Sequence, residues 1–115
     1  MNPATSPAQP VSQSASMTVV IETISYINDM VDHAGQSHAE FQEQASAGDT
    51  IRTVLRRFAA RHTKLKEALW DADTGEMGPH VEVIVNDAIL DIHHTLDSFV
   101  KDGDHIILTG QYIGG

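Results

Sequence analysis

The sequence predicts a small α+β domain in which a mixed sheet of four to five strands packs against one main helix. Three observations favour this class. β-branched residues gather near both ends of the folded part, a stretch between them repeats its apolar residues at helical spacing, and turn-forming residues separate these segments. A length of 115 residues with 41% hydrophobic residues allows one domain with a core of its own.

The chain divides into an extension, a domain and a tail. Residues 1–16 hold three prolines and no charged side chain, so we expect a disordered N-terminal extension that buries too little apolar surface to offset its ordering entropy. We expect the folded domain over residues 17–110. Residues 111–115 are expected to form a flexible C-terminal tail that ends in Gly-Gly.

The first part of the domain reads as two strands. Residues 17–26 (MTVVIETISY) are rich in β-branched residues and predict the first strand. Residues 28–37 carry turn formers, with Gly35 as the expected turning point. A weaker strand is expected over 38–44, with Phe41 as its core candidate.

The central part of the domain predicts the main helix. One apolar stripe recurs at i, i+3, i+4, i+7 and i+8 and consists of Ile51, Val54, Leu55, Phe58 and Ala59. Asp49 or Thr50 offers the side-chain oxygen of an N-cap after the turn at Gly48. A second, short helical piece is expected from Thr63 to Trp70.

The last part of the domain returns to strands. Two glycines and a proline within 71–80 break the helix. Residues 80–85 predict a strand with its alternate valines on one face, and Asn86-Asp87 turns the chain into a short return strand at 89–90. An apolar turn at 96–100 and the turn at 101–104 precede the last strand, which we expect over 105–109.

Composition excludes several classes of function. Sixteen acidic against seven basic residues give a net charge of −9, which argues against nucleic acid as a partner. Without cysteine there is no disulfide, thiolate zinc site or cysteine nucleophile. No apolar stretch approaches the ~20 residues that span a bilayer, and the start lacks the basic and apolar regions of a signal peptide. We therefore expect a cytoplasmic protein with no membrane partner.

Two groups of residues are candidates for binding sites. Six of the seven basic residues fall within 49–66, which indicates either a docking patch for an acidic partner, including Arg52 and Arg56, or an ordinary solvated helix face. Seven histidines raise the question of a metal, but His93 and His94 are adjacent and point to opposite faces of an extended chain. With no H-x3-H spacing on a helix, we expect no metal site.

Four segments carry a resemblance to a known family. They are Gly48-Asp49-Thr50-Ile51 at the start of the helix, VEVIVND at 81–87, KDGDHI at 101–106, and the terminal Gly114-Gly115. In this order they resemble the ubiquitin-like β-grasp proteins, and most closely their sulfur-carrier branch, the MoaD and ThiS family. The resemblance covers residues 17–115 and implies a β-grasp fold.

The resemblance also implies a function at the C-terminus. An adenylyltransferase similar to the ubiquitin-activating enzymes (MoeB/ThiF-like) would use ATP to adenylate Gly115, and a sulfur donor would convert it to a thiocarboxylate. Tyr112, Ile113 and Gly114 would thread into the partner, since glycine lacks Cβ and allows close backbone approach. The chain would be a co-substrate and not an enzyme, with no permanently bound cofactor and its sulfur held covalently at Gly115.

The sequence is compatible with several functions of this terminus. The acceptor of the sulfur could belong to molybdopterin biosynthesis, with this chain as the small subunit of molybdopterin synthase, or to cysteine or thio-metabolite biosynthesis. A lysine could instead attack the activated Gly115, which would make the chain a protein modifier, or the domain could be a non-covalent interaction module. The family resemblance further implies an apolar partner surface on the sheet. The candidate residue for this surface is Ile84, which is expected on the face opposite to that of Val83.

Overall fold

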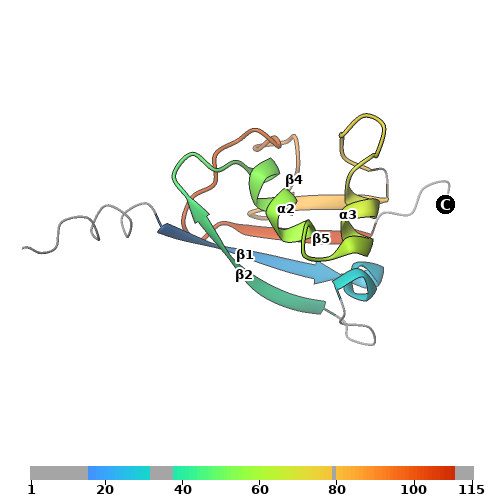
Figure 1. The fold of residues 1–115 in the computed structure, drawn as a ribbon. Helices are drawn as coiled ribbons and strands as arrows, with labels where there is room; N and C mark the ends of the chain where they lie inside the picture. Colours follow the sequence, from blue (N-terminus) through green and yellow to red (C-terminus); the bar gives the residue numbers. More distant parts are fainter. Residues whose placement is uncertain (1–15, 32–37, 79, 111–115) are drawn as a thin grey trace, which may run out of the picture.

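The computed structural model describes residues 16–31, 38–78 and 80–110 and confirms the α+β class (Figure 1). The elements in chain order are β1 (Ser16–Ile24), the 3-10 helix η1 (Ser25–Val31), β2 (His38–Ser46), α2 (Ile51–Ala59), α3 (Thr63–Leu69), β3 (Val81–Val85), β4 (Ala88–Ile89) and β5 (His105–Gly110). The predicted extension lies outside the described residues except for Ser16, at which β1 begins. No helix in the described ranges is long and apolar enough to cross a membrane.

The five strands form one mixed sheet in the order β2-β1-β5-β3-β4. The two central strands, β1 and β5, are parallel, and Val20 pairs with His105 between them. All other neighbours are antiparallel, including the long hairpin of β1 with β2. The first and last strands of the domain therefore lie side by side, and the last strand occupies the centre of the sheet.

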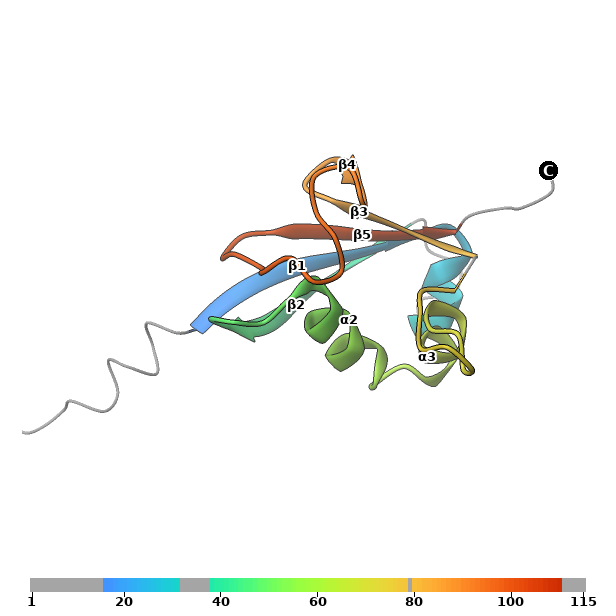
Figure 2. The same ribbon diagram turned by 90° about the horizontal axis from the view of Figure 1, so that it is seen from above.

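Helices α2 and α3 lie on one side of the sheet, which we call the covered face (Figure 2). The strands alternate, so that every second side chain enters the core between the sheet and the helices. The apolar stripe predicted for α2 is buried in full. The largest fully buried side chains come from both layers and include Phe58, Ile21, Ile27, Ile51, Leu55, Leu65, Leu69, Ile106 and Leu108.

The start of α2 is fixed by its cap. Thr50 is the N-cap, and its hydroxyl accepts a hydrogen bond from the backbone N–H of Thr53 at 3.2 Å, while the Thr53 hydroxyl accepts from the backbone N–H of Thr50 at 2.7 Å. This reciprocal pair is a capping box. Asp49, the other candidate, instead closes the turn after β2 by accepting from the backbone N–H of Ser46 at 3.0 Å.

The segment after β1 differs from the sequence prediction. The strand ends at Ile24 and not at Tyr26, and residues 25–31 form a 3-10 helix where the start of an irregular turn was expected. Ser25 adopts a positive φ of 66°, which redirects the chain. The helix forms because Ile27 and Val31 bury their side chains in the core, and long-range burial outweighs the local turn propensity of this stretch.

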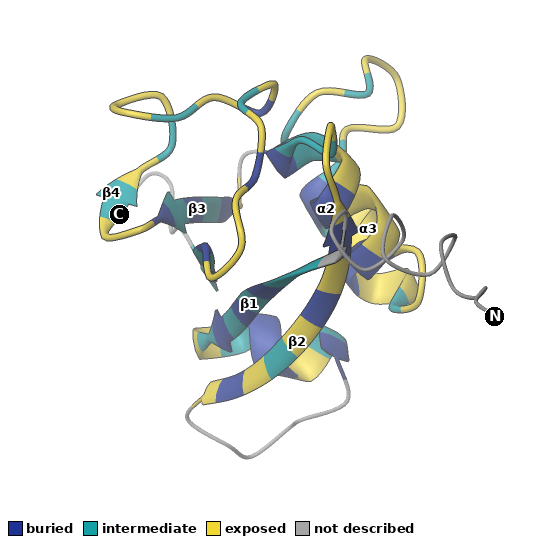
Figure 3. Cartoon of the chain, turned by 90° about the vertical axis from the view of Figure 1, so that its left-hand side faces the viewer, coloured by how far each residue is buried: buried dark blue, intermediate teal, exposed yellow. Residues whose placement is uncertain are grey.

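Two further strand boundaries are close to those expected. β2 continues to Ser46, two residues beyond the predicted end, and its residues alternate between buried and exposed (Figure 3). Asn86 and Asp87 both have positive φ, as a two-residue hairpin turn requires, and they join β3 to a return strand at 88–89. In the predicted apolar turn, Leu96 and Val100 are buried but Phe99 is 68% exposed.

Candidate functional site

The base of the predicted tail is tightly packed at the end of β5. Gly110 is the last described residue, and a Cβ at this position would overlap the ring of Tyr26 in η1. The Tyr26 hydroxyl donates a hydrogen bond to the backbone carbonyl of His80, just before β3. One tyrosine thus ties together η1, β3 and β5 where residues 111–115 follow. The predicted site residues of the tail, Tyr112, Ile113, Gly114 and Gly115, lie outside the described residues.

The side of the sheet opposite the helices, which we call the open face, carries an apolar row. Ile84 lies on this face, since Val83 and Val85 on the same strand are buried in the core and Ile84 is only half-buried. In register, Ile84 pairs with Ile107 on β5 and with Ile89 on β4. Ile89 is 48% exposed. The three isoleucines therefore form a continuous row across three strands, which we call the isoleucine row.

An ionisable cluster continues the same line toward the other edge of the sheet. Glu22 pairs with Ile107 across β1 and β5, and Glu40 on β2 pairs with Glu22. The His105 Nε2 lies 3.0 Å from a carboxylate oxygen of Glu22. Glu22, Glu40 and His105 each place one potential metal-ligating atom within 4.8 Å of the others. The contact with the His105 ring gives one of these two neighbouring carboxylates a polar partner.

The predicted basic patch lies on the other side of the sheet from Ile84. Arg52 and Arg56 both belong to α2, which packs on the covered face (Figure 2), so the structure does not bring them together with the isoleucine row. The Arg52 Nε lies 3.2 Å from a carboxylate oxygen of Asp97. Arg56 instead stacks its guanidinium over the ring of Trp70, 5.0 Å from its centroid. The two predicted arginines thus have different surroundings.

Two other arginines of this segment hold the helix to its neighbours. Arg57 lies 3.1 Å from the carboxylate of Asp49. The backbone N–H of Ser46 and, more weakly, this arginine lower the pKa of the Asp49 carboxyl. Arg61 pairs with Glu43, whose side chain is only 4% exposed, and the hydrogen bond to Glu43 raises the pKa of the Arg61 guanidinium. Both ion pairs anchor the α2 region to β2 or to the turn that follows it.

Sequence reasoning found Ile84 but missed its neighbours. Ile107 reaches Ile84 only because β5 inserts beside β3, whereas Ile89 faces Ile84 across the hairpin turn at Asn86-Asp87. Glu22 and Glu40 meet across the hairpin of β1 with β2, and His105 joins them only because β5 also lies beside β1. Two signals were available in the sequence: the alternation of β5 places His105 and Ile107 on a common face, and the tight turn after β3 places Ile89 opposite Ile84.

Comparison with known proteins identifies the fold. No known family profile and no curated protein matches the sequence. Solved structures do match, among them the small archaeal modifier protein 1 from Methanosarcina acetivorans, with 13% identity, a TM-score of 0.70, and coverage of 87% of this chain and 98% of that one. A proposed subunit 1 of a molybdopterin converting factor from Pyrococcus furiosus matches with 21% identity and a TM-score of 0.58 over 84% and 99% of the two chains.

A third match is a structure of a complex, the BexX/CysO complex of Amycolatopsis orientalis, with 22% identity, a TM-score of 0.57 and coverage of 84% and 99%. At these identities the likeness establishes the fold. The domain has the ubiquitin-like β-grasp fold, as the sequence resemblance predicted.

Proposed function

We propose that this chain is a sulfur carrier that acts through the carboxylate of Gly115. The observation that supports this most is the position of Gly110, which ends a central strand of a β-grasp sheet and is held by Tyr26, five residues before Gly115. A rigid base followed by a slender Gly-Gly end suits a carboxylate that must reach into the active site of another protein. The carrier contributes no catalytic side chain and serves as a co-substrate.

The proposed chemistry has two steps on the partner enzymes. A Gly115 carboxylate oxygen attacks the α-phosphorus of ATP in a MoeB/ThiF-like adenylyltransferase, which forms an acyl adenylate and releases pyrophosphate. Hydrosulfide from a sulfur donor then attacks the acyl carbon, and AMP leaves with the electron pair of the broken C–O bond. The product is a thiocarboxylate at Gly115. An acceptor enzyme of molybdopterin, cysteine or thio-metabolite biosynthesis would consume this sulfur in the cytoplasm.

The isoleucine row is the surface we assign to the adenylyltransferase. Ile84, Ile107 and Ile89 expose apolar area on a face that no helix of the described residues covers. Contiguous apolar area of this kind is typical of protein-binding surfaces. The solved complex of a similarly folded chain, CysO with BexX, is consistent with a β-grasp domain that docks onto a protein partner.

Mass spectrometry of the protein isolated from its host tests the proposal. Tryptic cleavage after Lys101 releases residues 102–115, which contain no Met or Trp whose oxidation could imitate replacement of oxygen by sulfur. We expect the terminal carboxylate to carry that replacement. An added residue after Gly115, or Gly115→Ala, should abolish sulfur transfer in the reconstituted pathway, and an extended chain that still functions would contradict the proposal.

The same experiment tests a second candidate function. The similarity to a small archaeal modifier protein favours conjugation, in which a lysine amine attacks the Gly115 adenylate or a thioester derived from it. Peptides that join Gly115 to lysines of other proteins would establish this role. A plain carboxylate, even after incubation with the adenylyltransferase and ATP, would support a non-covalent interaction module instead.

A further inference from the structure

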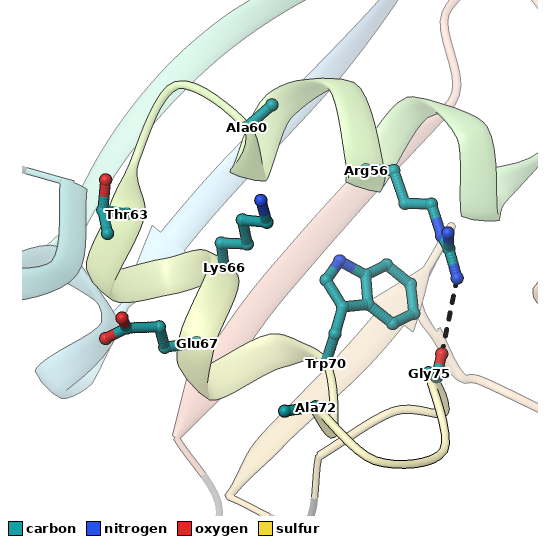
Figure 4. Close-up of a pocket in the computed structure, with 8 residues that line it drawn as sticks. All are labelled: Arg56, Ala60, Thr63, Lys66, Glu67, Trp70, Ala72 and Gly75. Atoms are coloured by element: carbon teal, nitrogen blue, oxygen red, sulfur yellow. Dashed lines mark hydrogen bonds between the residues drawn. The ribbon is translucent and has the colours of Figure 1, made fainter.

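A cavity of about 540 Å³ opens between α2, α3 and the loop after α3 (Figure 4). Its volume lies in the range of pockets that hold a bound group. It belongs to the helix layer, so it is separate from the isoleucine row on the open face. Neither the proposed terminal chemistry nor the proposed docking of the sheet uses it.

Trp70 forms one wall of this cavity and is held in place by Arg56. The Arg56 guanidinium stacks over the indole, and its Nη2 donates a hydrogen bond to the backbone carbonyl of Gly75 at 3.4 Å. The indole Nε1 is buried, and no acceptor for its N–H is present among the described residues. Figure 4 shows the nitrogen-bearing edge of the ring turned toward Lys66. A buried indole N–H usually donates a hydrogen bond to an acceptor. The Trp70 N–H is therefore placed to donate to an acceptor atom of a bound group.

Two of the side chains that line the cavity, Arg56 and Lys66, are cations without a carboxylate partner among the described residues. Arg52, Arg57 and Arg61 each have a carboxylate partner, whereas within the described part of the chain neither Arg56 nor Lys66 forms an ion pair. Among the described lining residues the single carboxylate is that of Glu67, and Figure 4 shows it pointing away from Trp70. A chain of net charge −9 thus offers two uncompensated cations beside a buried hydrogen-bond donor.

We propose that this cavity binds an acidic segment of a partner protein. An Asp or Glu carboxylate of that segment would lie between Arg56 and Lys66 and accept the hydrogen bond from the Trp70 N–H. A neighbouring apolar side chain would pack on the indole and on Ala60, which also lines the cavity. Trp and Arg are the residues most enriched at the energetic centres of protein interfaces.

The geometry favours a carboxylate over a phosphate group. Phosphate sites commonly use several backbone N–H groups at a helix N-terminus or in a glycine-rich loop. Here both cations are long side chains that project from the flanks of two helices. The inference is independent of the proposed function, because it holds for a carrier, a modifier or an interaction module alike.

Selection from a phage-displayed library of random short peptides tests the inference on the full chain. Peptides are retained on the wild-type protein after depletion on the double variant Arg56→Gln/Lys66→Gln. We expect the retained sequences to be enriched in Asp and Glu beside an apolar residue. Failure to enrich any peptide, or enrichment of peptides without acidic residues, would overturn the proposal.

Titration of a selected peptide provides the matched control. Trp70 is the only tryptophan in the chain, so its fluorescence reports directly on the cavity. Lys66→Gln should weaken binding about tenfold and Lys66→Arg should restore it. Lys64→Gln removes the same charge from an exposed site on α3 that does not line the cavity and should change affinity less than about twofold.

Two results of this titration would contradict the inference. Equal losses of peptide affinity for Lys64→Gln and Lys66→Gln would mean that binding depends only on the overall charge of α3 and not on the cavity. Saturable quenching of Trp70 by inorganic phosphate or ADP, at lower concentrations than by the selected peptide, would assign the cavity to a phosphate-bearing ligand. Because both lysines are exposed, unfolding is not expected to obscure the comparison, and circular dichroism of each variant checks this.

Discussion

The covered face and the open face of the same sheet are built from alternate residues of the same strands, yet they differ in purpose. On the covered face, Ile21 of β1 and Ile106 and Leu108 of β5 are fully buried against the helices. On the open face, Glu22 and His105 lie beside the isoleucine row, and each of the two is only half-buried. The covered face stabilises the fold, because its apolar side chains are removed from water when the sheet packs against the helices.

The open face shows what folding by itself does not explain. Polar residues would satisfy its strand positions equally well, since alternation places hydrophobic residues on the packed side of a half-covered sheet. A row of isoleucines on the solvent side therefore points to a contact with another protein. The difference between the faces leads to four predictions, given in order of expected effect.

Phe58→Ala should be the most damaging change. Phe58 is fully buried, with its ring centroid 5.1 Å from that of Phe41. Removing the ring leaves a cavity in the core and should lower the free energy of unfolding by about 4 kcal/mol. Urea denaturation measures this loss. Phe99→Ala, at an exposed position, should cost less than about 0.5 kcal/mol, and similar losses for the two variants would contradict the assigned core.

Arg61→Met should show that the buried Glu43 carboxylate on the covered face depends on its ion pair with Arg61. The change leaves Glu43 buried without a guanidinium and should lower the free energy of unfolding by about 2 kcal/mol, less than for a fully buried pair because Arg61 is itself exposed. The double variant Arg61→Met/Glu43→Gln should recover part of the loss in thermal melts. A double variant less stable than Arg61→Met would refute this account.

Asp49→Asn should weaken the turn that leads from the sheet into α2, by about 1 kcal/mol at neutral pH. The pKa of Asp49 is lower in the folded chain than its unfolded value of about 3.9. The contribution of the Asp49 carboxylate to the free energy of unfolding is therefore complete above its unfolded pKa and is lost as pH falls through its folded pKa. Urea denaturation of both proteins across this acidic range should show their difference shrinking, and a difference independent of pH would exclude the carboxylate as its source.

Ile84→Ser should have the smallest effect on stability, about 1 kcal/mol or less, because the side chain lies on the open face. Under the proposed function it should nevertheless slow adenylation of Gly115 by the partner enzyme about tenfold, which a pyrophosphate-release assay measures. Glu82→Ser changes a residue on the same strand and face outside the isoleucine row and serves as the control. Equal adenylation rates for the two variants would remove the isoleucine row from the docking surface.

Much of the fold could be predicted because local interactions decide it. The apolar spacing from Ile51 to Ala59 and the cap at Thr50 specify α2 within a few turns of chain. Asn86 and Asp87 tolerate the positive φ that the tight turn after β3 needs. The segment 25–31 could not be predicted in this way, since its 3-10 helix depends on core partners from other elements.

The sequence by itself determined the order of the elements, the direction in which Ile84 points and the dense basic segment of 49–66, because each follows from the spacing of neighbouring residues. Only the tertiary structure decided which side chains meet. Ile84 meets Ile107 because the last strand inserts between the first and the third. Arg56 meets Trp70, while Arg52 is neutralised by Asp97, because the loops after α3 and β4 return to α2 at different points. These contacts join residues distant in the chain, and the packing of the whole domain selects them.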